Sequence, residues 1–166
     1  ITSKWGQRRR VLFNLYNEPR GGQVNGTLNF FDESSFDPDG TLIREWTIWM
    51  QSTIDAIRQL GGINTIFVPG LRFTSCRDWT GADFWGETIN GVTNAGNTRL
   101  AALTDPLNLV AYDVHQYFND QYTGTEPGCA GHFSNAFTPG APGADFYLEE
   151  TIKWAKMYNK KLIMLE

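Results

Sequence analysis

The chain has 166 residues, of which 41% are hydrophobic and 19% are charged. This length is typical of one domain, and the composition excludes a disordered tail or a coiled coil. The formal charge of −4 disfavours binding to a phosphate backbone, so we expect no nucleic-acid partner. No apolar run approaches the length that spans a bilayer, so we expect no membrane partner.

The first half of the chain predicts two buried strands with a helix between them. Arg10–Tyr16 is a short apolar run that indicates a strand buried on both faces. Residues 20–40 are rich in Gly, Asn, Asp and Ser, which predicts a long loop. The apolar spacing over residues 41–60 predicts a helix ended by two glycines, and a second strand is expected over 63–68.

The second half repeats this pattern with two further strands. Leu109–Val114 and Leu162–Leu165 are apolar runs typical of buried strands. A helix is expected over Asp145–Asn159, because its acidic residues come early and its lysines late, as the helix dipole favours. The remaining segments predict two long polar loops, 71–97 and 119–143, and a short helix that follows the first of them, near 98–103.

The alternation of strands and helices predicts a parallel sheet built from (β/α) units. The long polar loops follow strands, whereas the connections that enter strands are short, as in a (β/α)8 barrel. A doubly wound open sheet would share this feature, but the chain has no G-x-G-x-x-G motif or P-loop to bind a nucleotide. The predicted core is listed here: Val11, Phe13, Trp46, Met50, Ile54, Ile57, Ile66, Val68, Val110, Ile152, Ala155 and Ile163.

Three of the predicted strands end in polar residues that would meet at one face. Glu18 follows the first strand, His115 and Tyr117 follow the third, and Glu166 ends the fourth. Two carboxylates on different parallel strands are what cleavage of a glycosidic bond requires. Each residue alone has an ordinary explanation, such as a solvent-facing acid or a histidine packed at the rim of the core. Their coincidence at successive strand ends favours a catalytic role.

Four motifs resemble glycoside hydrolase family 5, a cellulase-type family of (β/α)8 barrels. Leu12–Pro19, which ends in Asn-Glu-Pro, is similar to the family's fourth strand. Phe67–Gly70 followed by Trp79–Trp85 is similar to the fifth strand and its aromatic loop. Asp105–Tyr117, with its His-x-Tyr, is similar to the sixth strand, and Lys161–Glu166 is similar to the seventh.

The resemblance implies an α/β fold that is about half of a TIM barrel, with residues 1–166 forming one partial catalytic domain. Strands four to seven are present, and the N- and C-terminal portions of the barrel are missing. Either the chain is a fragment of a longer enzyme, or a half barrel completes itself by self-association through its open edges. Residues 71–78 look like sequence added to the family's pattern.

The resemblance also implies a retaining β-glycosidase, closest to endo-β-1,4-glucanases (cellulases), with a β-1,4-glucan as substrate and no metal or organic cofactor. Glu166 is then the nucleophile and Glu18 the acid/base. Tyr117 would hold the nucleophile in place. His115 would bond the same carboxylate or a sugar hydroxyl.

Three further residues are expected to bind substrate. Asn17 would bond the sugar 2-hydroxyl, and Trp79 and Trp85 would stack on sugar rings. Other interpretations stay open, namely a mannanase or another β-glucan hydrolase, a non-catalytic carbohydrate-binding half barrel, and a purely structural βα fragment. Two facing glutamates would favour hydrolysis, because sugar binding alone does not need them.

Two features bear weakly on the compartment. Cys76 and Cys129 allow one disulfide or two free thiols, and the sequence does not decide between them. Asn25-Gly26-Thr27 is an acceptor sequence for N-glycosylation. Together with the resemblance, these features predict an extracellular protein.

Overall fold

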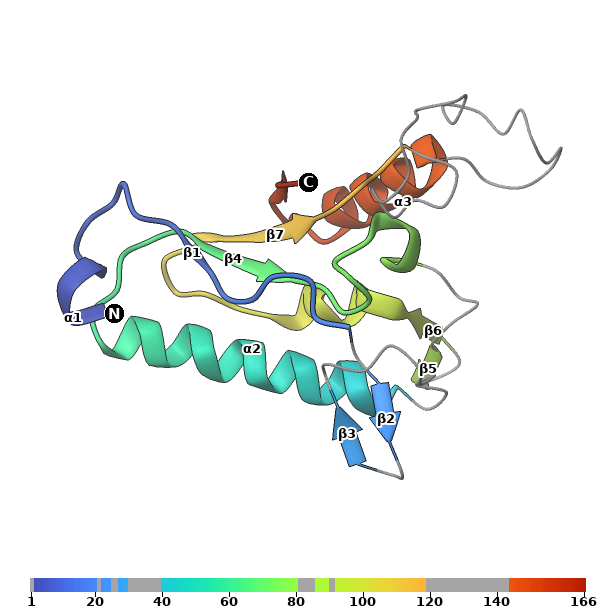
Figure 1. Ribbon diagram of the computed structural model, residues 1–166, viewed down its shortest axis with the longest axis horizontal. Helices are drawn as coiled ribbons and strands as arrows, with labels where there is room; N and C mark the ends of the chain where they lie inside the picture. Colours follow the sequence, from blue (N-terminus) through green and yellow to red (C-terminus); the bar gives the residue numbers. More distant parts are fainter. Residues whose placement is uncertain are drawn as a thin grey trace, which may run out of the picture.

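The computed structural model describes residues 2–20, 22–24, 27–29, 40–80, 86–89, 92–118 and 144–166. Its central element is a four-stranded sheet in the order β1-β4-β7-β8, and each neighbouring pair is parallel (Figure 1). The strands are Phe13–Asn14 (β1), Ile66–Pro69 (β4), Val110–Val114 (β7) and Leu162–Met164 (β8). The predicted parallel sheet of (β/α) units is therefore confirmed.

The first strand is shorter than the sequence predicts. Only Phe13–Asn14 is regular strand, although the amide of Leu15 also donates to the Phe67 carbonyl at 3.1 Å. β1 is at the edge of the sheet and pairs with β4 alone, so fewer hydrogen bonds hold it extended. The chain beyond Leu15 bends away from the strand direction before it reaches Glu18.

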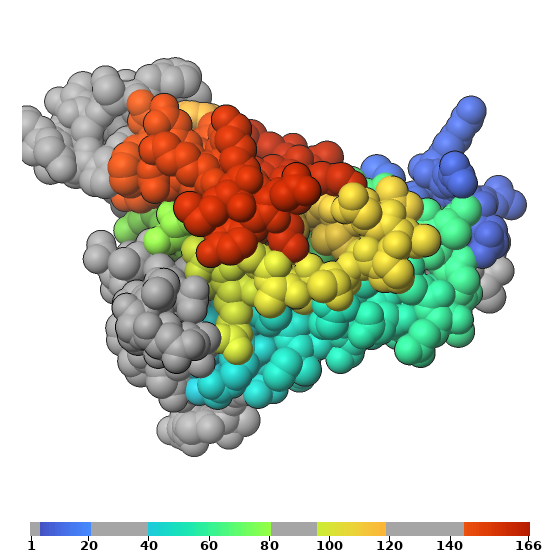
Figure 2. Space-filling view, turned by 180° about the vertical axis from the view of Figure 1, so that it is seen from behind, coloured from blue at the N-terminus to red at the C-terminus, as the bar shows by residue number. Residues whose placement is uncertain are grey.

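Two long helices pack against the sheet, and short helices lie in the connections. The long helices are Thr41–Gln59 (α2) and Ala144–Met157 (α3). The short ones are Thr2–Trp5 (α1) and the 3-10 helices Cys76–Asp78 (η1) and Gly96–Ala102 (η2). Seen from behind, the orange-red C-terminal segment and the cyan α2 lie on either side of the yellow segment from η2 toward β7 (Figure 2).

The predicted loops at 20–40 and 71–97 contain two antiparallel hairpins. One pairs Gly22–Val24 (β2) with Thr27–Asn29 (β3), and the other pairs Gly86–Ile89 (β5) with Val92–Ala95 (β6). In both cases the sequence between the strands is Asn-Gly. This dipeptide favours the two-residue turns that join hairpin strands, so the signal was in the sequence.

The core lies between the sheet and the two long helices. Six predicted core residues are buried: Trp46, Met50, Ile54, Ile66, Val68 and Ala155. The other six are half-buried: Val11, Phe13, Ile57, Val110, Ile152 and Ile163. The half-buried set includes members of β1 and β8, because an edge strand has a sheet neighbour on one side only.

A buried ion pair fastens the end of α2 to the sheet. Arg58 donates from Nε to Asp105 Oδ1 at 2.7 Å and from Nη2 to Oδ2 at 2.9 Å. Its Nη1 donates to the carbonyls of Gly62 and Asn64, each at 2.9 Å. The two side chains are 7% and 2% exposed. This network fixes the connections that enter β4 and β7, at the end of the sheet opposite the candidate site.

Among the described residues, no helix is both long enough and apolar enough to cross a membrane.

Candidate active site

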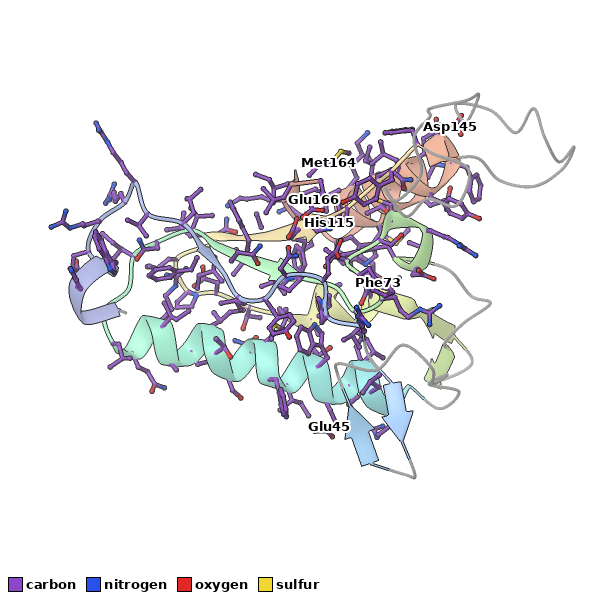
Figure 3. The ribbon with its side chains drawn as sticks, in the orientation of Figure 1. Glu45, Phe73, His115, Asp145, Met164 and Glu166 are labelled. Atoms are coloured by element: carbon purple, nitrogen blue, oxygen red, sulfur yellow. The ribbon has the colours of Figure 1, made fainter. Side chains whose placement is uncertain are left out.

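Three predicted site residues meet where the parallel strands end. One nitrogen of His115 and one carboxylate oxygen each of Glu18 and Glu166 lie within 4.8 Å of one another. Figure 3 shows His115 and Glu166 side by side at this end of the sheet. Because β1, β7 and β8 run in the same direction, the residues that follow them come together here.

His115 faces both glutamates with one ring nitrogen. Its Nδ1 is 2.8 Å from Glu18 Oε1 and 3.8 Å from Glu166 Oε2, and the side chain is 2% exposed. Burial alone would lower the pKa of the imidazole. The carboxylates of Asp113 and Glu18 and the charge of Glu166 outweigh burial, so the pKa of His115 is raised above its usual 6.5. The three carboxylates thus favour the protonated form of the ring.

Tyr117 contacts the carboxylate of Glu166. Its hydroxyl donates a short hydrogen bond to Oε2 of Glu166. This bond, followed by burial and the negative charges of Glu166 and Glu18, raises the pKa of Tyr117 to about 12. Tyr117 is thus a neutral donor that holds one oxygen of Glu166 and leaves the other oxygen for chemistry.

A turn of left-handed backbone supports the segment that carries Glu18. Arg72, Phe73 and Thr74 have φ values of 59°, 58° and 60°, a conformation that non-glycine residues rarely adopt. The amide of Arg72 donates to the Arg20 carbonyl at 3.0 Å, and that of Phe73 to the Pro19 carbonyl at 3.1 Å. We call residues 72–74 the left-handed turn.

The same turn also holds the backbone of His115. The amide of His115 donates to the Thr74 carbonyl at 2.9 Å, and the amide of Cys76 donates to the His115 carbonyl at 3.0 Å. Residues 71–78, which the sequence analysis treats as additional to the family's pattern, therefore bond to the backbone at two strand ends. They fix the position of the Glu18 segment relative to His115.

Asn97, in η2, holds Leu71, the residue that comes directly before the left-handed turn. Its Oδ1 accepts from the Leu71 amide at 2.8 Å, and its Nδ2 donates to the Leu71 carbonyl at 3.0 Å. Asn97 and Leu71 are both fully buried. Asn97 was not predicted from the sequence, because nothing near it in the chain marks it as a partner of a residue 26 positions earlier.

Cys76 does not add to the site. Cys76 is a buried free thiol, and burial raises its pKa to about 12, so it is a poor nucleophile. Cys129 lies outside the described residues.

Among the described residues, Glu18, His115 and Glu166 also form a group whose spacing would allow them to hold a metal ion. The hydrogen bonds of Glu18 with His115 and of Glu166 with Tyr117 already use these donor atoms. We therefore treat the group as a proton-transfer site and assign no metal to it.

Comparison with known proteins identifies the family. The model for Cellulase (glycosyl hydrolase family 5) matches residues 1–166. The chain belongs to glycosyl hydrolase family 5. Among curated relatives, Endoglucanase gh5-1 of Neurospora crassa is 41% identical over 130 residues, covering 78% of this chain and 25% of that protein.

Two solved structures share the fold over nearly the whole chain. The endo-beta-1,4-glucanase Xac0029 from Xanthomonas axonopodis pv. citri is 26% identical, with a TM-score of 0.61 over 93% of this chain and 37% of that one. XacCel5A in complex with cellopentaose is 27% identical, with a TM-score of 0.65 over 97% of this chain and 40% of that one. The chain thus spans between 25% and 40% of the length of these family 5 relatives.

Within this family 5 chain, the residues expected to bind substrate differ in their placement. Asn17 is exposed beside Glu18, where a ligand can reach it. Trp79 is fully buried, and its ring packs edge-on against Trp154 at a centroid distance of 5.3 Å. The expectation that Trp79 stacks on a sugar is therefore wrong, because its ring belongs to the core between η1 and α3. Trp85 lies outside the described residues.

Proposed function

We propose that the enzyme containing this chain is a retaining β-glycoside hydrolase that cuts internal β-1,4-glucosidic bonds, and that residues 1–166 are part of its catalytic domain. The observation that carries this proposal is the close approach of two carboxylates, with one oxygen each of Glu18 and Glu166 within 4.8 Å. Retaining glycosidases hold their carboxyl groups about 5–5.5 Å apart, whereas inverting ones need about 6.5–9.5 Å. A module that only binds sugar needs no such pair.

In the first step, an oxygen of Glu166 attacks the anomeric carbon while the bond to the leaving sugar breaks. Glu18 gives its proton to the leaving oxygen, and a covalent glycosyl-enzyme forms. In the second step, the Glu18 carboxylate takes a proton from water, whose oxygen attacks the anomeric carbon and releases Glu166. Two inversions leave the sugar with its original configuration.

The neighbouring side chains suit these two steps. The hydrogen bond from Tyr117 holds Glu166 Oε2, which leaves Oε1 to act as the nucleophile. The Nδ1 of His115, 2.8 Å from Glu18 Oε1, can donate to the carboxylate that Glu18 becomes after it loses its proton. Asn17 is the candidate donor to the sugar 2-hydroxyl, a contact that strengthens in the transition state.

The relatives support a β-1,4-glucan as the substrate. The names of two of them describe an endoglucanase and an endo-beta-1,4-glucanase, and the structure of a third relative holds cellopentaose. A polymer of this kind is too large to enter a cell, so we place the enzyme outside the cell. A panel of glucan, mannan and mixed-linkage glucan would show whether the preference of these relatives holds here.

The roles of the two glutamates can be separated by kinetics in the enzyme that contains this chain. Glu166→Ala should abolish turnover, because no covalent intermediate can form. Glu18→Ala should still form the intermediate from an aryl glycoside with a good leaving group, and azide should speed its breakdown because azide needs no general base. Glu149→Ala, at an exposed site on α3, is the matched control and should keep full activity.

Two outcomes would contradict the proposal. If Glu18→Ala with azide is as inactive on the aryl glycoside as Glu166→Ala, the acid/base assignment is wrong. If both variants keep full activity, the enzyme is not a glycosidase of this type.

A further inference from the structure

A third carboxylate lies beneath the catalytic pair. Asp113, in β7, is two residues before His115, so both side chains extend from the same face of the strand. Asp113 is fully buried, and its Oδ2 is 3.4 Å from Nε2 of His115. The two ring nitrogens of His115 therefore face carboxylates on opposite sides, with Asp113 at Nε2 and Glu18 at Nδ1.

Asp113 has few other partners among the described residues. Asn14 donates from Nδ2 to its Oδ2 at 3.5 Å, which is a long contact, and its Oδ1 has no hydrogen-bond partner there. A buried carboxylate without compensation is costly, and a nearby positive charge would offset that cost. Within the described part of the chain, the basic group that lies within ion-pair distance of Asp113 is the imidazole of His115, which carries a charge when it is protonated.

We propose that Asp113 is a positioning residue that keeps the His115 ring oriented and positively charged beside Glu18. This proposal rests on the proposed function, because it gives Asp113 and His115 a role in the steps in which Glu18 loses and regains its proton. At 3.4 Å the contact is longer than a normal hydrogen bond, so its attraction depends on opposite charges. A neutral imidazole has one N–H and could donate to only one of its two neighbours, whereas the imidazolium can serve both.

This arrangement assists the step in which Glu18 loses its proton. The N–H at Nδ1 of His115 is then in place to donate to the new carboxylate without any movement of the ring. The charge of Asp113 keeps that proton on the ring. An amide at position 113 has the same shape but no charge, so it would still fill the space while removing the support for the imidazolium.

The test uses four forms of the enzyme that contains this chain: the wild type, Asp113→Asn, His115→Gln and the double variant. A positioned acid or base contributes about 10²–10⁴-fold to rate, so Asp113→Asn should lower kcat at least about tenfold, with KM changed less than about threefold. In the His115→Gln background the same change should alter kcat less than about twofold, because Asp113 acts through His115. Equal losses in both backgrounds would overturn the proposal.

Asp105→Asn is the matched control. Asp105 is also a buried aspartate beside a positive group, with its Oδ1 2.7 Å from Nε of Arg58, but it lies at the end of the sheet opposite the site and is not among the neighbours of His115. The folded variant should keep kcat within about twofold, since Asp105 does not touch the catalytic group. If folded Asp105→Asn and Asp113→Asn lose kcat equally, the role of Asp113 is merely structural.

A measurement on the unmodified enzyme covers the case in which Asp113→Asn does not fold. Nitrogen NMR of the His115 ring at the pH of maximal activity should show both nitrogens protonated. A neutral ring would overturn the proposal. A neutral ring would leave the proposed function intact. The proposed function would fail instead if the Glu18 and Glu166 variants kept their activity.

Discussion

The Nδ1 of His115 lies 2.8 Å from Oε1 of Glu18, although 97 residues separate them in the chain. The sheet brings them together, because β4 lies between β1 and β7 and all three strands are parallel. The left-handed turn then bonds to the backbone next to Glu18 and to His115 itself. The proton-transfer group is thus held by strand order and by one connection, and α2 adds a hydrogen bond from Trp46 Nε1 to the Pro69 carbonyl at the end of β4.

Tyr117→Phe should slow the enzyme while leaving its fold intact. The variant loses the hydrogen bond to Oε2 of Glu166 and nothing else of comparable strength. Hydrogen bonds to charged groups contribute about 1.5–3 kcal/mol, so kcat/KM should fall about tenfold to a hundredfold. Tyr158→Phe, which alters an exposed ring after α3, is the control. Equal kcat/KM for both variants would show that Tyr117 has no role in catalysis.

The raised pKa of His115 predicts how stability depends on pH. A group whose pKa is higher in the folded state stabilises the protein below its unfolded pKa and loses this contribution as pH rises through the folded value. The difference in unfolding free energy between wild type and His115→Gln should therefore be greatest below about pH 6.5 and should shrink toward alkaline pH. Urea unfolding at several pH values measures it. A difference that grows with pH would mean that the ring is buried neutral.

The sequence was sufficient to predict the parallel sheet and the meeting of Glu18, His115 and Glu166 at one end of it. Apolar runs of strand length alternate with helical spacing, and the polar residues that follow them mark the face where strands end. Asp113 could also have been found, because an aspartate inside the apolar run Leu109–Val114 needs a partner. The sequence analysis described that run as a buried strand and gave its one charged residue no role.

Other features could not be read from the chain. Trp79 stands among polar loop residues, and its burial depends on Trp154 and Tyr112, which come much later in the sequence. The left-handed turn contains no glycine, so no residue type announces its positive φ values. Both features follow from tertiary packing that local patterns do not contain.

Ile54→Ala should destabilise the protein strongly. Ile54 is fully buried on the face of α2 that packs against the sheet, and truncation of such a residue costs about 2–5 kcal/mol in unfolding free energy. Ile48→Ala is the control on the same helix, because Ile48 is 51% exposed. Denaturant titration of both variants would measure the contrast. Similar losses would show that α2 packs through a different face.

Asn97→Ala should affect stability and activity together. The change leaves the buried amide and carbonyl of Leu71 without partners, and each unsatisfied group costs about 1–3 kcal/mol. Loss of this anchor should also loosen the left-handed turn and lower kcat of the folded enzyme. Asn64→Ala is the control, since Asn64 is equally buried and bonds to the carbonyls of Arg8 and Val11 at the far end of the sheet. A normal kcat in folded Asn97→Ala would separate the turn from catalysis.

Asp105→Asn should remove a contribution to stability that depends on ionisation. Burial would raise the pKa of this carboxyl, but the hydrogen bonds from Arg58 and from the amides of Leu109 and Leu107, with the charge of Arg58, lower it below 3.8. Breaking one partner of a buried pair costs about 3–5 kcal/mol. Because the pKa is depressed, this loss should be complete above the unfolded pKa of about 3.9. It should shrink as pH falls from there through the folded pKa, below which the wild type also loses the charge. Lys153→Ala breaks an exposed pair with Glu150 and should change the unfolding free energy little. Denaturant unfolding of both variants between neutral and strongly acidic pH measures the difference. If the loss of unfolding free energy in Asp105→Asn does not depend on pH, shape rather than charge holds α2 to the sheet.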